Sequence, residues 1–291
     1  MVKKTIPNAE VQSYVLVTSK TFSFEPGTWY VVNGDVSIAY RISNKGTTTS
    51  PAHLILCDGS KLYAPYGITN SGKSELTIYA QTTNAENMGA LIIDSVQEHY
   101  AGIGGKEGTN GGTITINGGR VAVKGGSNGA GIGGSWDNHA GSVVINGGIV
   151  TATGGSDAAG IGNGKLSRIT VQKGGSITIN GGTVIAIGGD GGAGIGGGVE
   201  YNIDTVTITG GTVTATGGGI QGGGAGIGGG DDESGGEIMI EGGTVIAIGG
   251  PHGAGIGGGE DGNAGSVIIN GGIVTASATC SGDGIHGTSI E

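Results

Sequence analysis

Aromatic residues and proline are scarce in this chain, whose 291 residues include two Trp, two Phe and five Pro. Glycine, in contrast, occurs 71 times. Because glycine loses more backbone entropy on folding than any other residue, this composition disfavours an ordinary globular core unless each glycine has a geometric role. Two classes of chain remain: a disordered low-complexity chain, or a repeat protein with glycine at recurring corners.

Basic residues are also few, with 13 Lys and Arg against 23 Asp and Glu, for a net charge of -10. Such a chain repels nucleic acid phosphates and anionic lipid, so we expect neither as a partner, whereas acidic patches suit divalent cations. The sequence contains no apolar run of about 18 residues, so we expect no membrane insertion.

Two other signals are weak. Cys57 and Cys280 lie far apart and have no metal-binding spacing, and we interpret them as isolated thiols rather than a disulfide. The start "MVKKTIPNAE" has a basic pair with no apolar segment behind it, so no signal peptide is visible. We therefore expect a cytoplasmic protein, a phage-borne protein, or a chain that begins after a removed export signal.

A repeat dominates the rest of the sequence. Its first marker is the tetrapeptide A-G-I-G, and a second marker, an alternating segment that ends in Gly-Gly, follows at a nearly fixed offset. Two markers in phase exclude chance low complexity. A-G-I-G begins at Ala101, Ala130, Ala159, Ala193, Ala225 and Ala254, at intervals of 29, 29, 34, 32 and 29 residues; the second marker ends at Gly119, Gly148, Gly182, Gly211, Gly243 and Gly272.

Each unit contains a short strand, a Gly-Gly corner, a second strand, another corner, a compact third side and a variable loop. A period of about 29 residues with this content predicts an all-β fold, a single-stranded parallel β-helix or solenoid with three short sides per coil. Glycine suits the corners because it accepts positive φ and close backbone approach. A phosphate-binding loop is excluded, because it needs a following helix and occurs once per domain.

Alternation along each strand predicts which side chains point into the coil. Coils stack about 4.8 Å apart, so equivalent residues form columns. The predicted inward set is Ile114/Ile116, Val143/Ile145, Ile177/Ile179, Val206/Ile208, Ile238/Ile240 and Val267/Ile269 on the first side; Val121/Val123, Val150/Ala152, Val184/Ala186, Val213/Ala215, Val245/Ala247 and Val274/Ala276 on the second; and Ile103, Ile132, Ile161, Ile195, Ile227, Ile256 and Ile285 on the third.

Residues 1–100 lack the A-G-I-G marker but keep alternating segments, with "YGITN" in its place. We expect two or three less regular coils there, with residues 1–50 serving partly as a cap, because an open solenoid end exposes unpaired strands. Residues 101–291 form the regular coils, and the two parts are expected to make one continuous domain.

The segments "GTWYVVNGDVSI", "LILCDGSKLYA", "ELTIYAQ" and the reiterated "GGTITINGG" and "GAGIGGG" resemble glycine-rich repeat regions of large secreted or cell-wall proteins of gut Firmicutes. Such regions are described as carbohydrate-binding or β-helix repeats. More distantly, the chain is similar to a clostridial β-helix protein of pectate-lyase-like architecture that binds polysaccharide. The resemblance implies an extracellular or cell-surface location, and hence a removed export signal, but it supplies no catalytic residue.

Acidic residues recur six or seven positions after the alanine of each A-G-I-G marker, except where Lys165 and Leu166 stand. If coils stack in register, Glu200, Asp232 and Asp261 lie on three successive coils. Carboxylates on adjacent coils repel one another unless a proton or a cation lies between them, and such clusters of carboxylates suit calcium. The alternatives are a solvated acidic rim and, less in keeping with the sequence, catalysis.

Two further groups are candidate ligand-binding residues. Trp136, Asp137 and His139 in "SWDNHAG" combine an aromatic ring with polar partners, although a surface loop with one Trp is often unremarkable. The outward positions of the second side alternate Thr-x-Thr with Ile-x-Ile from coil to coil, and the Thr pairs are Thr151, Thr153, Thr214 and Thr216.

This strip suggests a contact surface for sugars, a partner chain or a covering loop, or simply residues chosen for strand propensity. A pure Thr-x-Thr array would suggest ice binding, but the Ile pairs and the longer coils break that register. Asn117, Asn146, Asn180 and Asn270 are expected to form a hydrogen-bonded ladder at a corner.

The sequence thus predicts a non-enzymatic extracellular solenoid, a structural or adhesin module whose partner is a glycan or a host surface. One alternative is a lyase or hydrolase of acidic polysaccharides, which needs a base or a carboxylate pair. Another is the receptor-binding tip of a phage. Ligand and oligomeric state stay open. Candidate bases are few, since the basic residues between positions 107 and 291 are Arg120, Lys124, Lys165, Arg168 and Lys173.

Overall fold

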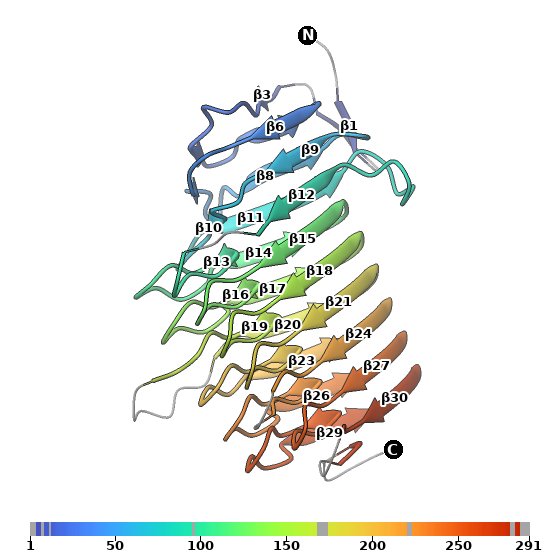
Figure 1. The fold of residues 1–291 in the computed structure, drawn as a ribbon. Helices are drawn as coiled ribbons and strands as arrows, with labels where there is room; N and C mark the ends of the chain where they lie inside the picture. Colours follow the sequence, from blue (N-terminus) through green and yellow to red (C-terminus); the bar gives the residue numbers. More distant parts are fainter. Residues whose placement is uncertain are drawn as a thin grey trace.

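The chain winds through successive coils that stack along one axis, with the two termini near opposite ends of the stack (Figure 1). The computed structural model describes residues 4–6, 9–11, 13–94, 97–167, 174–219, 223–279 and 283–285. All the regular elements in these ranges are β-strands. The same ranges contain no helix that is long and apolar enough to cross a membrane.

Three parallel sheets form the walls of the solenoid, and an antiparallel hairpin of β1 (Lys4–Ile6) and β2 (Ala9–Val11) lies at the N-terminal end. The ten-stranded first sheet contains β3 (Val15–Leu16), β5 (Trp29–Val32), β8 (Ala52–Leu56), β11 (Glu75–Ala80), β14 (Thr113–Ile116), β17 (Ser142–Ile145), β20 (Ser176–Ile179), β23 (Thr205–Ile208), β26 (Glu237–Ile240) and β29 (Ser266–Ile269).

The second and third sheets have nine strands each. The second contains β6 (Asp35–Ser37), β9 (Lys61–Tyr63), β12 (Ala90–Ile93), β15 (Arg120–Lys124), β18 (Ile149–Thr153), β21 (Thr183–Ile187), β24 (Thr212–Thr216), β27 (Thr244–Ile248) and β30 (Ile273–Ser277). The third contains β4 (Ser23–Phe24), β7 (Ile42–Asn44), β10 (Ile68–Thr69), β13 (Ile103–Gly104), β16 (Ile132–Gly133), β19 (Ile161–Gly162), β22 (Ile195–Gly196), β25 (Ile227–Gly228) and β28 (Ile256–Gly257).

Equivalent positions of neighbouring coils pair directly across every sheet. Ile132, for example, pairs with Ile103 on one side and with Ile161 on the other. The predicted all-β parallel β-helix with three sides is therefore confirmed, and the A-G-I-G marker forms the third sheet. The same pairing joins Ile68 of "YGITN" to Ile103, so that segment does take the place of A-G-I-G.

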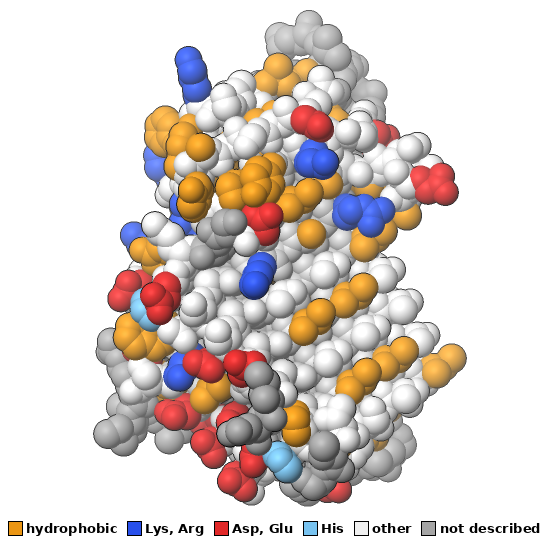
Figure 2. Space-filling view, viewed as in Figure 1, with side chains coloured by type: hydrophobic (Ala, Val, Ile, Leu, Met, Phe, Trp, Pro, Cys, Tyr) orange, Lys and Arg blue, Asp and Glu red, His pale blue; other side chains and the backbone are white. Residues whose placement is uncertain are grey.

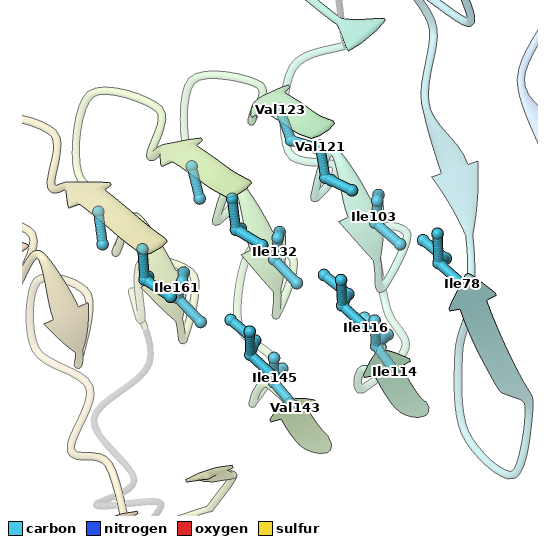
Figure 3. Close-up of a cluster of buried hydrophobic side chains, with 14 of the residues drawn as sticks. Ile78, Ile103, Ile114, Ile116, Val121, Val123, Ile132, Val143, Ile145 and Ile161 are labelled. Carbon is cyan, nitrogen blue, oxygen red and sulfur yellow. The ribbon is translucent and has the colours of Figure 1, made fainter. Parts of the chain in front are cut away.

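The core is a narrow column of aliphatic side chains from all three sheets. Figure 3 shows Ile103, Ile114, Ile116, Val121 and Val123 directed into the space between the sides of one coil. All five are buried, and burial of such a side chain contributes about 1.5–3 kcal/mol. The predicted columns are buried along the stack, and their last members, Ile269, Val274, Ala276 and Ile285, are partly buried against the same core.

The N-terminal coils carry larger side chains and a second apolar layer. Val31, Ile55 and Cys57 point outward from the first sheet, yet they are buried in a satellite cluster that includes Val11 at the end of the hairpin. On the same face, the Trp29 ring stacks on His53 with centroids 4.1 Å apart. This layer covers the outer face of the sheet at that end of the molecule. Cys280, the other cysteine predicted to be an isolated thiol, lies outside the described residues.

Tight turns flank several of the short strands of the third sheet. In one coil the N–H of Gly129 donates to the carbonyl of Gly126 at 2.9 Å before the strand, and that of Asn138 donates to Ser135 at 3.0 Å after it. The second turn also bonds to the first turn of the preceding coil, as in the 3.0 Å bond from the Trp136 N–H to the His99 carbonyl. The strand is consequently buried beneath the turns.

Gly162 shows how closely the coils fit. Its φ is +142°, and a Cβ placed there would collide with the carbonyl of Gly196 on the next coil. Gly59 also has a positive φ, +67°, but a Cβ there would meet nothing within 4 Å.

These two glycines separate backbone strain from coil collision. Gly59→Ala should lower the free energy of unfolding by about 1 kcal/mol, because only the left-handed conformation is disfavoured. Gly162→Ala should cost more than about 3 kcal/mol, because the strain is joined by a clash with backbone that cannot rotate away. Urea denaturation followed by circular dichroism measures both, and equal losses would contradict the close fit.

Candidate functional site

The acidic column lies in the turns that follow the third-sheet strands. Asp137, Glu200, Asp232 and Asp261 all have positive φ, between 54° and 62°. Each is the third residue of a turn closed by a backbone hydrogen bond, such as that from the Tyr201 N–H to the Gly198 carbonyl at 3.1 Å. Aspartate tolerates this left-handed conformation better than most residues, so turn geometry alone accounts for much of the column.

Backbone hydrogen bonds join the acidic turns of successive coils. The N–H of Glu200 donates to the carbonyl of Asp231 at 3.1 Å, and that of Asp232 donates to Glu260 at 2.9 Å. The predicted residues Glu200, Asp232 and Asp261 therefore do lie on successive coils along one edge. In the coil before them, Leu166 takes the same place and is buried.

The carboxylates of this edge repel one another. Partial burial raises the pKa of Asp231 above its usual range, and the charges of Asp232, Glu260 and Asp261 raise it further. In the described part of the chain, however, no three His, Cys, Asp or Glu side chains come together in a way that could hold a metal ion. The geometry thus adds no support to the predicted calcium site, which stays a prediction.

The loop of Trp136, Asp137 and His139 directs these residues to different neighbours. The Trp136 ring stacks on His99 of the preceding coil, with centroids 4.3 Å apart. Asp137 Oδ1 accepts hydrogen bonds from the N–H and hydroxyl of Ser167 at 2.8 and 3.1 Å. His139 Nδ1 accepts from the Gly141 N–H at 3.1 Å, and burial lowers the pKa of this imidazole. These contacts give the loop a packing role, and ligand binding there stays a prediction.

The outward positions of the second sheet form an ordered surface. Thr151 pairs with Ile185, which pairs with Thr214, and the column continues through Ile246 to Thr275. Thr153 and Thr216 lie in the adjacent column in the same way. We define the Thr/Ile face as the outward side chains of β18, β21, β24, β27 and β30: Ile149, Thr151, Thr153, Thr183, Ile185, Ile187, Thr212, Thr214, Thr216, Thr244, Ile246, Ile248, Ile273, Thr275 and Ser277.

The Thr/Ile face carries no charge on any of its five strands, all of which are described. In Figure 2, rows of hydrophobic side chains alternate across it with rows of other uncharged side chains. Ile185, Ile187 and Ile246 are 38–39% exposed, and Ile273 at the end is 70% exposed. The face is therefore accessible, moderately apolar and rich in hydroxyl groups.

A glycine-floored hollow flanks the Thr/Ile face at each end of its strands. Near the strand starts, a hollow of about 340 Å³ reaches Ile149 and Thr183. Near the strand ends, one of about 420 Å³ is lined by Thr153 and Lys124, with Asp94 and Asp190 also in its wall. The face and the two hollows form one continuous surface.

An amide ladder borders the first of these hollows, as predicted for Asn117, Asn146 and Asn180. The place of Asn270 in the ladder stays a prediction. Asn146 Nδ2 donates to Asn117 Oδ1, Asn180 Nδ2 donates to Asn146 Oδ1, and the Thr209 hydroxyl donates to Asn180 Oδ1, all at 2.8 Å. These exposed side chains are held in fixed orientations along the corner between the first and second sheets.

Sequence reasoning missed two features near the N-terminal end. One is the cluster of Trp29, His53 and Tyr79 on the outer face of the first sheet. The other is the loop of residues 81–89, which overhangs the first hollow. The sequence does carry a signal for the loop, because the segments "ELTIYA" and "ALII" are much farther apart than the corresponding segments of later units, which are joined through a Gly-Gly corner.

The raised pKa of Asp231, which comes from burial and from the neighbouring charges, predicts a pH-dependent stability. A raised folded-state pKa means that ionised Asp231 destabilises the fold, so its favourable contribution is present at low pH and is lost as pH rises through the folded pKa. Asp231→Asn should raise the free energy of unfolding at pH 7 by up to about 1 kcal/mol, since the group is partly solvated. The gain should vanish below the usual aspartate pKa of 3.8.

Thermal melts between pH 3 and pH 8 measure this effect. Asp190→Asn, at an exposed turn position, is the matched control and should shift the melting temperature much less at every pH. A gain for Asp231→Asn that is the same at pH 3 as at pH 7 would contradict the assignment.

Comparison with known proteins agrees with this geometry. A family model for the beta helix repeat matches residues 143–165, 177–199, 206–231 and 238–260. Each match runs from the first inward residue of a first-sheet strand to the second residue of the turn that carries the acidic column. Searches of the curated proteins and of the solved structures found no match. The chain is a β-helix repeat protein.

Proposed function

We propose that this protein is a non-catalytic, extracellular scaffold that binds an uncharged polysaccharide through its Thr/Ile face. The observation that carries the proposal is the absence of charge from five consecutive, fully described strands in a chain of net charge -10. Exposed apolar strips mark contact surfaces, and this one is also flat and regular. The resemblance to secreted repeat regions supports the extracellular location.

The chemistry of the face suits a neutral sugar polymer. Sugar rings have apolar C–H faces and hydroxyl edges, and the face alternates Ile side chains with Thr hydroxyls. Rungs repeat about every 4.8 Å along the axis, and alternate residues of a strand lie roughly 6.6 Å apart. A nucleic acid or an acidic polysaccharide would find no cation on these strands to pair with its charge.

The size of the face argues against a second copy of the chain as its occupant. Five strands of five residues cover about 24 Å by about 16 Å, or roughly 400 Å². A stable protein interface buries about 800 Å² on each partner. A polymer is a better match, because repeated weak contacts along one chain or one solid surface add up through avidity.

The hollow at the strand ends is the place where the enzymatic alternative would act. It brings Lys124 together with Asp94 and Asp190, so it contains a candidate base and two carboxylates. Of the other described Lys and Arg residues between positions 107 and 291, Lys165 pairs with Asp157 at 2.9 Å and Arg120 donates to the Ala85 carbonyl at 2.9 Å. Release of unsaturated or reducing ends from acidic polysaccharides, abolished in Lys124→Ala, would establish catalysis and overturn the proposal.

Charge placed on the Thr/Ile face should abolish binding to insoluble cellulose or chitin in a sedimentation assay. Thr214 and Ile246 face outward on adjacent coils, and replacing both by Lys should weaken binding at least about tenfold, because a charge would be desolvated against the sugar. The control is Thr178→Lys with Thr207→Lys, which adds the same charge to adjacent outward positions of the first sheet. Equal losses in the two variants, or no binding by the parent, would contradict the proposal.

A further inference from the structure

The loop of residues 81–89 is a departure from the repeat at one corner. In the later coils the first and second sheets are joined through a Gly-Gly corner, such as Gly147–Gly148, but between β11 and β12 the chain makes a nine-residue excursion. The excursion protrudes at the edge of the second sheet in Figure 1. Solenoids usually carry function in such insertions, because the stacked coils leave little else free to vary.

Hydrogen bonds hold the loop of residues 81–89 in one conformation, so that it forms a wall of the hollow. The Asn84 N–H donates to the Thr82 hydroxyl at 2.7 Å, and the N–H groups of Glu86 and Met88 donate to Asn84 Oδ1 and its carbonyl oxygen at 3.1 and 3.0 Å. Arg120 on the next coil ties the loop down through the bond from Nη2 to the Ala85 carbonyl at 2.9 Å. The overhang is thus ordered before any ligand arrives.

The hollow beneath the loop has three kinds of surface. Thr82, Thr83, Ala85 and Met88 line it from the loop, and the corner glycines form the floor, where the absence of side chains lets a ligand reach the backbone. Asn117 and Asn146 line the opposite side. None of the described residues that line this hollow is charged.

The amides of the wall are preorganised. Asn146 receives one ladder bond at Oδ1 and gives one from Nδ2, which leaves a second lone pair and a second N–H on this exposed side chain. The bonds hold the plane of each amide, so little rotamer entropy is lost when these groups bind a ligand. An amide with one donor and one acceptor in a fixed direction matches a pair of vicinal sugar hydroxyls.

We infer that this hollow is the primary saccharide site, and that it takes an uncharged sugar unit of the chain whose continuation lies on the Thr/Ile face. The inference rests on the proposed function and adds its specific subsite. Met88 and Ala85 contact the C–H face of the ring, while Asn117 and Asn146 bond its hydroxyls. A volume of about 340 Å³ is at the low end of the ~300–1,000 Å³ range of ligand pockets, which suits a short stretch of glycan.

Acidic sugars are excluded from this subsite by its chemistry. The guanidinium of Arg120 donates to the loop backbone, and the lining supplies only amide, hydroxyl, glycine and small apolar groups. A uronate carboxylate would lose its hydration without gaining a cation. Ile149 and Thr183, which belong to both the hollow and the Thr/Ile face, provide the path from the subsite to the rest of the polymer.

Calorimetry on the full chain tests the inference with cellohexaose, chitohexaose and mannohexaose as uncharged probes and hexagalacturonate as the charged comparator. At least one uncharged probe should bind and the comparator should not. Ala85→Trp fills the hollow from an exposed loop position and should weaken binding at least tenfold. Asn87→Trp places the same ring on the same loop outside the lining and should leave binding unchanged.

A second variant guards against a folding defect. Asn146→Asp keeps the shape of the side chain but places a carboxylate in the wall, so it should weaken oligosaccharide binding by a similar factor. The variant gives up the bond from Nδ2 to Asn117 Oδ1, so its melting temperature should fall slightly while its circular dichroism at 25 °C stays that of the parent. No heat with any uncharged probe, preference for hexagalacturonate, or full affinity in Ala85→Trp would overturn the subsite. If sedimentation with cellulose or chitin still depends on Thr214 and Ile246 in those cases, the proposed function stands without it.

Discussion

The structure depends on the parallel backbone ladder that seats each coil on the one before it. Because every sheet pairs equivalent positions, a residue type that suits one coil must also suit its neighbours above and below. Aliphatic columns satisfy this condition by burying Val and Ile in a continuous core, as in Ile103, Ile132 and Ile161. The same condition explains glycine at the corners, since at Gly162 a single added methyl group would meet the backbone of the next coil.

Stacking also makes polar columns either cooperative or repulsive, according to the group that is repeated. An amide is both donor and acceptor, so Asn117, Asn146 and Asn180 form a chain of hydrogen bonds. A carboxylate only accepts, so the stacked acids repel one another and add to the effect of burial in raising the pKa of Asp231. The acidic column persists at an exposed edge, where solvent screens the charges and the left-handed turn favours a short polar residue.

The repeat was sufficient to predict the sheets, the inward columns and the ladder of Asn117, Asn146 and Asn180. Each of these follows from the stacking of equivalent residues on neighbouring coils. The repeat could not show that the Trp136 ring stacks on His99, since that contact joins the turn after one strand to the turn before a strand of the preceding coil. Trp136, Asp137 and His139 are close in sequence, yet neighbours from different segments engage them separately. The hollow under residues 81–89 was equally hidden, because it lies between an insertion and three later corners.

The repeated coils and the single insertion provide two different sources of binding on one surface. The alternating Thr and Ile rungs give the Thr/Ile face repeated contacts of the same two kinds, and therefore avidity for a repetitive ligand, but little means of selecting one position along that ligand. The loop of residues 81–89 breaks the repeat once, so it can select a particular sugar without disturbing the ladder beneath it. Because Arg120 anchors the loop to the regular coils, the geometry of the selective end is tied to that of the repetitive face. A polymer bound at both places would be fixed in register by the site under the loop and retained by the Thr/Ile face.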